Sequence, residues 1–320
     1  MKERGRAGLI SAATLFTSNT TINLLGPEAN MKPPHPLDVD QQRTSSSAGA
    51  VTLIRPKRRL SPFEWKELLE YRDLLYYLSL RDVKIRYKQT SLGVIWVVLQ
   101  PLVPAIIFAI LFGNFGRLPS NGQPYLLMVF TGLVVWGFLS NSVGRGSGSL
   151  VANSNLLSKI YFPRIIIPLA SLSSVVVDGL VGVAAMLVLA LIFGIRPGAH
   201  LIAAPFFLIA SFLMGLGITL FAASLNVYRR DIGYAIPFVL QAWNYMTPVV
   251  YSSSLIPKKW LILYSLNPTV GLIEGFRWSI LGGDPASPLM LASMTVGLVA
   301  SLVTGMAVFK NVERGFADII

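Results

Sequence analysis

The 320-residue chain has no cysteine, only two histidines and few charged residues. Without cysteine it has no disulfide, no thiolate nucleophile and no Cys-based metal site, although this says little about compartment. Two histidines, His35 and His200, are too few for a His-based metal site or a Ser/His/Asp triad. The phosphate-binding loop Gly-x-x-x-x-Gly-Lys-Ser/Thr is also missing. We therefore expect no catalytic residues, no metal site and no cofactor in this chain.

Charged residues are scarce, and basic residues outnumber acidic ones. Charged residues make up 13% of the chain and apolar residues 53%, whereas soluble domains are about a quarter charged. The net charge of +12 could suggest a nucleic-acid partner. The uncharged stretches are too long to lie on a folded polar surface, so we expect an all-α membrane protein that binds membrane lipids and no nucleic acid.

Six stretches are long enough to cross a bilayer core of about 30 Å, which takes roughly 20 helical residues. Pro101 and Pro104 lie in the first and predict a bend, because proline removes helix hydrogen bonds. The expected transmembrane domain covers 92–309, with spans at 92–113, 125–144, 166–193, 201–225, 234–251 and 287–309.

The distribution of basic residues predicts the orientation. With six spans both termini lie on one side, and that side receives 22 of the 27 lysines and arginines. Leaving out the first 54 residues still gives 17 of 22. Because basic residues favour the cytoplasmic side, we expect both termini, including the tail 310–320, in the cytoplasm.

Residues 1–54 imitate a signal peptide, since Lys2, Arg4 and Arg6 precede an apolar run. Cleavage there would require the ten basic residues of 55–88 to cross the membrane, against the positive-inside bias. The expectation is a disordered cytoplasmic tail. Met31 is an alternative start.

Next comes a helix-start signal, a capping box from Ser61 to Glu64 with Pro62 at the first helical position. Segment 55–91 is predicted to be an amphipathic interfacial helix followed by a basic juxtamembrane segment. The helix either lies in the membrane interface or packs on protein. The basic cluster either anchors the topology or contacts an anionic lipid-linked cargo. Its bases are Arg81, Lys84, Arg86 and Lys88.

A cytoplasmic segment at 153–164 predicts a short helix that Ser154 or Asn155 caps and Pro163 ends. It carries more apolar surface than a solvated loop needs, which is typical of a docking surface, although such helices are often only linkers. The candidate docking residues are Asn155, Leu156, Leu157, Lys159, Ile160, Tyr161 and Phe162.

Segment 252–284 is too long for a turn and too apolar for an exposed loop. Two short re-entrant helices broken at Asn267-Pro268 would fit and would form an external gate. Glu274 and Arg277, three residues apart, either neutralise each other or contact cargo. The candidate gate residues are Trp260, Tyr264, Asn267, Pro268, Glu274, Phe276, Arg277 and Trp278.

Asp178 is the one charge inside a predicted span. An intramembrane carboxylate is a functional candidate by default. The alternative is a structural contact with a buried polar partner.

Four stretches together carry a resemblance to a known family. They are RDVKIRYKQTSLG at 81–93 with Trp96, Gln100 and Pro101 following, KIYFPR at 159–164, NVYRRD at 226–231, and the segment from Asn267-Pro268 to EGFRW at 274–278. From about residue 60 to the closing residues 313–318, the chain resembles the ABC-2 type permeases. It is most similar to the polysaccharide-export permeases of the O-antigen, teichoic-acid and capsule systems, but residues 1–54 depart from that pattern.

The resemblance implies a homodimer in the bacterial cytoplasmic (inner) membrane that binds two copies of a nucleotide-binding ATPase subunit. ATP and Mg²⁺ would then lie on the partner chain, which docks through 153–164. The implied cargo is polysaccharide on undecaprenyl diphosphate, O-antigen first, and the helix from Ser61 would be a cytoplasmic gate helix. The alternatives are an exporter of small hydrophobic drugs or lipids, or a polytopic membrane transferase. A transferase should show a loop with clustered His, Asp and Glu, which the sequence lacks.

Overall fold

The computed structural model describes residues 65–88, 92–196 and 198–316. All of them belong to one compact unit. The predicted tail 1–54 and the capping box at 61–64 lie outside the described residues. Among the residues described, every regular element is a helix, which confirms the all-α fold.

Within the described residues, five helical segments are long and apolar enough to cross a membrane, and they coincide with five of the six predicted spans. Pro101 and Pro104 lie inside the first, which continues as a π-helix, η1. The segments are α3 (Ile95–Phe108) with η1 (Ala109–Phe115), α4 (Tyr125–Ala152), α6 (Ile166–Ile192), η2 (Ala199–Ala203) with α7 (Ala204–Tyr228), and α11 (Pro288–Val312).

The remaining predicted span, 234–251, is only partly helical. Helix α8 (Asp231–Tyr245) has 15 residues, or about 22 Å at 1.5 Å per residue, short of a 30 Å core. It ends before Thr247-Pro248, where the proline disfavours helical geometry in the residue before it. The six-span prediction is therefore not confirmed at this element.

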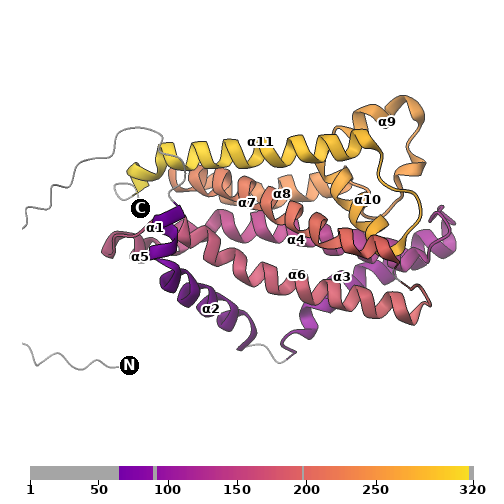
Figure 1. Cartoon of the computed structure of the whole chain (residues 1–320), viewed down its shortest axis with the longest axis horizontal. Coiled ribbons are helices and arrows are strands. Elements are labelled where there is room, and N and C mark those ends of the chain that lie inside the picture. Colours follow the sequence, from indigo (N-terminus) through magenta and orange to yellow (C-terminus); the bar gives the residue numbers. More distant parts are fainter. Residues whose placement is uncertain (1–64, 89–91, 197, 317–320) are drawn as a thin grey trace, which may run out of the picture. The chain divides into compact units, whose positions relative to one another are not determined.

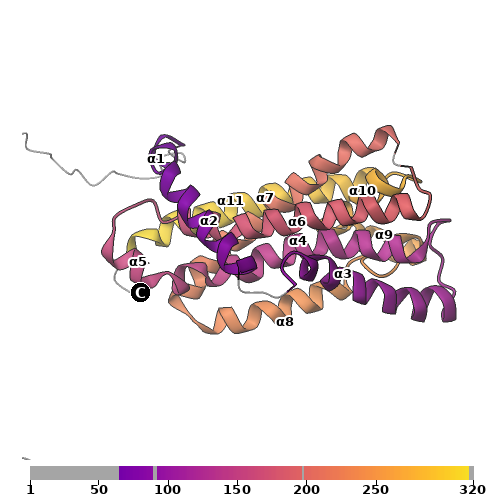
Figure 2. The same cartoon turned by 90° about the horizontal axis from the view of Figure 1, so that it is seen from below.

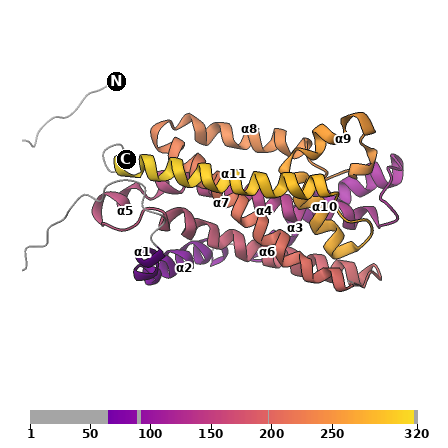
Figure 3. The same cartoon turned by 45° about the horizontal axis from the view of Figure 1, so that its top comes forward.

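Helices α4 and α7 form the centre of the bundle. They pack on each other, α6 packs on α4, α11 packs on α7, and the N-terminal helix α2 (Arg72–Lys88) packs on α6. Figure 2 shows α8 along one edge of the bundle. In Figure 3, α8 and α6 lie on opposite sides of α4, α7 and α11.

Helices α7 and α11 approach each other at two glycines. A Cβ atom on Gly305 would overlap the carbonyl oxygen of Gly217. Small residues allow such close backbone contact between membrane helices, where van der Waals packing drives association. This contact makes the α7–α11 pair sensitive to any side chain at Gly305.

The two ends of the bundle carry the short elements. Helix α5 (Ser154–Lys159) and the 3-10 turn η4 (Glu313–Gly315) lie at one end, together with α1 (Trp65–Glu70). Helices α9 (Lys258–Ser265) and α10 (Pro268–Leu281) lie at the other end, after the short turn η3 (Ser253–Leu255). The break between α9 and α10 falls at Asn267-Pro268, as the sequence predicts.

Candidate functional site

The basic cluster lies on α2 and divides into two faces. Arg81, Lys84 and Lys88 are spaced by three and four residues, so they share one face of the helix, and all three are exposed. Arg81 donates a hydrogen bond of 3.0 Å to Asn153, at the junction of α4 and α5. Arg86 points in another direction and is largely buried, so the exposed basic face consists of Arg81, Lys84 and Lys88.

Arg86 forms an ion pair with Asp178, the one charged residue inside a predicted span. Its Nη2 lies 2.6 Å from Asp178 Oδ2, and its Nε donates to Oδ1 at 2.9 Å. Arg145 of α4 lies 3.1 Å from the same carboxylate, and Tyr87 donates a further hydrogen bond to it. Asp178 is 7% exposed, so one buried carboxylate of α6 joins α2 to α4.

Three side chains, those of Arg86, Arg145 and Tyr87, satisfy both oxygens of Asp178. Burial and the hydrogen bond to Asp178 raise the pKa of Tyr87 above its ordinary value, so the phenol stays protonated and donates. Arg145 also donates to Ser174 at 3.2 Å. The geometry is that of a structural ion-pair network, the second of the two interpretations of Asp178.

The sequence indicated the carboxylate but not its partners. Arg145 falls just beyond the predicted span 125–144, whereas α4 continues to Ala152. It is the basic residue that directly follows the predicted second span. An intramembrane carboxylate usually pairs with a basic residue, so the position of Arg145 at the end of a predicted span could have identified it as a partner of Asp178.

The predicted docking segment forms a short helix with one exposed side. Tyr161 is 93% exposed and Ile160 is 54% exposed just after α5, while Leu157 and Phe162 are buried in the apolar cluster of that end of the bundle. Asn155 and Lys159 are exposed and Leu156 is partly buried. Only part of the predicted set is therefore available to a partner, with Tyr161 at its tip.

The C-terminal turn η4 contacts the end of this segment at Arg164. The Arg164 backbone N–H donates to Glu313 Oε1 at 3.2 Å, and the Arg164 guanidinium donates to the Glu313 carbonyl. The same guanidinium lies 5.8 Å from the centroid of the Phe316 ring. Because Phe316 is fully buried, these contacts fix the exit from α5 to the end of α11.

At the opposite end, Asn267 organises the start of α10. Its Oδ1 accepts hydrogen bonds from the Thr269 backbone N–H at 3.2 Å and from Trp243 Nε1 at 3.1 Å. Its Nδ2 donates to the Met246 carbonyl at 3.1 Å. With Pro268 at the first helical position, the cap ties α10 to the end of α8.

Glu274 and Arg277 bind each other, at 3.1 Å. Arg277 is 8% exposed and also donates to the Pro248 carbonyl at 2.6 Å, while Glu274 accepts from the Ser253 backbone N–H at 3.1 Å. The pair thus holds the connection after α8 over α10. This geometry favours mutual neutralisation, the first of the two interpretations.

The other candidate gate residues divide by exposure. Trp260 is exposed, Tyr264 and Trp278 are partly buried, and Phe276 is fully buried. Tyr264 donates to Tyr251 at 3.3 Å, and burial first, then this contact, raises the pKa of its phenol well above the ordinary value. Most of the predicted gate residues are therefore at least partly buried.

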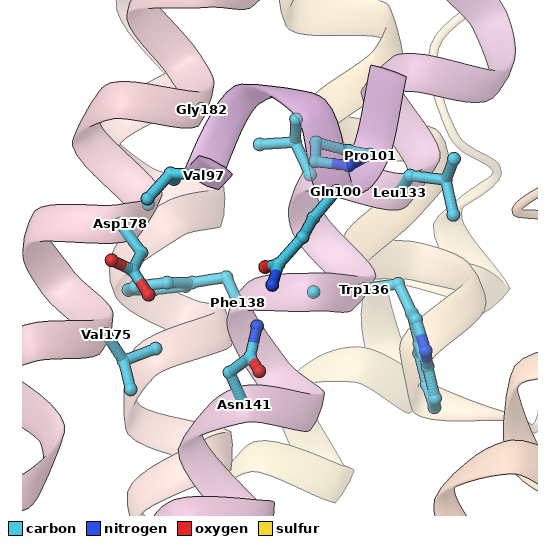
Figure 4. Close-up of a pocket in the computed structure, with 13 residues that line it drawn as sticks. Val97, Gln100, Pro101, Leu133, Trp136, Phe138, Asn141, Val175, Asp178 and Gly182 are labelled. Atoms are coloured by element: carbon cyan, nitrogen blue, oxygen red, sulfur yellow. The ribbon is translucent and has the colours of Figure 1, made fainter. Parts of the chain in front are cut away.

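A pocket of about 170 Å³ lies between α3, α4 and α6. Figure 4 shows its polar side chains, Gln100, Asn141 and Asp178, among apolar ones. The amides of Gln100 and Asn141 point toward each other, and the Trp136 ring turns away from them. In the described parts of the chain, no three His, Asp or Glu side chains gather as metal ligands would.

Comparison with known proteins gives one family and several relatives. The family model described as "ABC-2 type transporter" matches residues 73–281. An O-antigen export system permease protein RfbA of Klebsiella pneumoniae is 28% identical over 251 residues, which cover 78% of this chain and 95% of the relative. The Myxococcus xanthus RfbA is 29% identical, covering 80% of this chain and 98% of the relative. The polysialic acid transport protein KpsM of Escherichia coli is 22% identical, covering 74% and 92%.

Proposed function

Because this chain belongs to the ABC-2 type transporter family, we propose that it is the membrane subunit of an ATP-driven exporter of undecaprenyl-diphosphate-linked polysaccharide, most directly O-antigen. The observation that carries the proposal is the match to two O-antigen export permeases over 78% and 80% of the chain, nearly their full lengths. The exporter would act in the inner membrane, with α8 completing six spans and both termini in the cytoplasm.

The proposed transporter is a homodimer with two ATPase subunits docked at α5. Support comes from Tyr161 and Ile160, whose exposed apolar side chains stand on a segment anchored by Leu157 and Phe162. An apolar group held rigidly at the tip of a short helix suits insertion into a partner's pocket. ATP and Mg²⁺ would bind the partner.

The proposed coupling runs from α5 to α2. A displacement of α5 would reach α4 directly, through the Asn153 junction, and α2 through two contacts. These are the hydrogen bond between Arg81 and Asn153 and the ion pairs of Asp178 with Arg145 and Arg86. Movement of α2 would change access to the path between two copies, and α9 and α10 would gate the external end.

The exposed basic face, Arg81, Lys84 and Lys88, is the proposed contact for the diphosphate. A base near an anionic surface contributes about 1 kcal/mol, so replacing Lys84 and Lys88 by Gln should cost about 2 kcal/mol. That loss corresponds to roughly 30-fold weaker headgroup binding. The matched control is Lys258→Gln with Lys259→Gln, two exposed lysines of α9. Equal polymer at the cell surface for both pairs would refute this contact.

Deletion of the gene in its own cell tests the function itself. The proposal expects loss of surface polysaccharide and accumulation of the lipid-linked polymer inside, with both restored by the wild-type chain. Unchanged surface polysaccharide in the deletion strain would contradict the proposal.

A further inference from the structure

The pocket between α3, α4 and α6 is lined by two side-chain amides. Gln100 comes from α3 and Asn141 from α4, and neither side-chain amide has a hydrogen-bond partner among the described residues. Each amide offers two N–H donors and one carbonyl acceptor. Since the two amides point toward each other across the pocket, a ligand there would meet donors and acceptors on both sides (Figure 4).

The electrostatics favour a neutral ligand. Asp178 lines the pocket, so a bound anion would lie beside a carboxylate. A cation is not required either, because Arg86, Arg145 and Tyr87 already satisfy both carboxylate oxygens. A group that hydrogen-bonds without carrying charge, such as an alcohol, suits this environment.

The size and the lining of the pocket limit which neutral ligand it could bind. A volume of about 170 Å³ is equivalent to five or six water molecules at roughly 30 Å³ each, which is room for one sugar ring. The apolar wall, formed by Val97, Pro101, Leu133 and Val175, suits the C–H face of such a ring. A polyprenyl chain would cover the two amides without offering them a hydrogen bond, at a cost.

We propose that this pocket is a sugar-binding subsite, in which Gln100 and Asn141 bind the hydroxyl groups of one sugar ring of the transported polysaccharide. The subsite rests on the proposed function, since that function supplies the sugar. Gln100 is exposed and Asn141 is partly buried, so the ring would enter from the Gln100 side and contact Asn141 at depth.

The absence of cysteine makes occupancy of the pocket measurable. Leu133→Cys places one thiol on the wall and leaves all three polar side chains intact. The assay is the rate at which a small methanethiosulfonate reagent labels this thiol in the full transporter in nanodiscs. Two probes are compared, undecaprenyl diphosphate and the same lipid carrying a trisaccharide. Val303→Cys, on an exposed face of α11 outside the pocket, is the control.

At about ten times its Kd, the trisaccharide lipid should leave the pocket free about a tenth of the time and slow labelling about tenfold. The sugar-free lipid should not slow it, and labelling at Val303→Cys should not change with either lipid. Adding Gln100→Leu and Asn141→Leu to Leu133→Cys should abolish the protection. Equal protection by both lipids would overturn the proposal in favour of a lipid-chain site, and absence of protection would overturn it outright.

Failure of the subsite is distinguishable from failure of the proposed function. ATP hydrolysis is measured with the wild-type transporter in nanodiscs, in the presence of each of the two lipids. Stimulation by the trisaccharide lipid without protection at Leu133→Cys refutes the subsite alone. Absence of stimulation by either lipid counts against the proposed function itself.

Discussion

Replacing Asp178 by Asn should destabilise the bundle more than any other single charge removal in the spans. The substitution keeps the shape of the side chain but removes the charge that Arg86 and Arg145 share at 2.6 Å and 3.1 Å. Two guanidiniums would then face each other without a carboxylate between them. Loss of this link should loosen α2 from α6 first.

The expected loss of folding free energy depends on how deeply this ion pair is buried. Removing one partner of a fully buried ion pair costs about 3–5 kcal/mol. The side chains of Arg86 and Arg145 are 25% and 28% exposed, so water compensates them in part. A loss of about 2–3 kcal/mol remains, which at 2–4 °C per kcal/mol lowers Tm by about 4–12 °C.

The assay is thermal unfolding of the purified permease in detergent, with Asp82→Asn as the matched control. Asp82 binds Arg81 at 2.9 Å on the surface of α2, and an exposed pair contributes at most about 1 kcal/mol. The double variant Asp178→Asn with Arg145→Gln should lose less than the sum of the two single variants, because they share one interaction. Equal Tm values for Asp178→Asn and Asp82→Asn, or strict additivity, would refute the ion-pair network.

Three further predictions concern the two ends of the bundle and its centre. Tyr161→Ala should cost about 2 kcal/mol of ATPase binding, measured by co-purification, whereas Tyr245→Ala, at another exposed tyrosine, on α8, should not; equal recovery of the ATPase would contradict docking at α5. Gly305→Leu should prevent the close contact of α7 with α11 and lower the yield of folded protein in size-exclusion chromatography, and a normal elution profile would count against that contact. The folded state holds the pKa of Tyr264 above its ordinary 10.0, so stability should fall as pH rises above about 10; Tyr264→Phe should lessen that fall in thermal unfolding, and an unchanged pH profile would refute the assignment.

Hydropathy predicted the long helices well, because a run of 20 or more apolar residues leaves few other structures possible in a bilayer. It predicted the ends of the helices less well. α4 runs to Ala152 although its polar part begins near Asn141, because that part packs against α6 and α7 inside the protein. α8 stops at Tyr245 although the apolar run continues, because Pro248 follows.

Side-chain partners across the fold were harder to predict. Composition identified the basic cluster and the lone carboxylate separately, but their pairing depends on α2 packing on α6, a tertiary contact without a local signal. The break at Asn267-Pro268 was different, since Asn-Pro is itself a local helix-start signal, and the break lies where predicted. The pocket at Gln100 and Asn141 was not predicted, because three helices form it.

The central claim, that this chain exports lipid-linked polysaccharide, is tested most directly by reconstituting it with its ATPase in proteoliposomes. The measurement is ATP-dependent transfer of an undecaprenyl-diphosphate-linked oligosaccharide to the opposite leaflet, scored by its accessibility to a glycosidase. The account predicts transfer that needs ATP and is reduced by Tyr161→Ala. Transfer that is equal with and without ATP, or absent while a sugar-free lipid is moved, would contradict it.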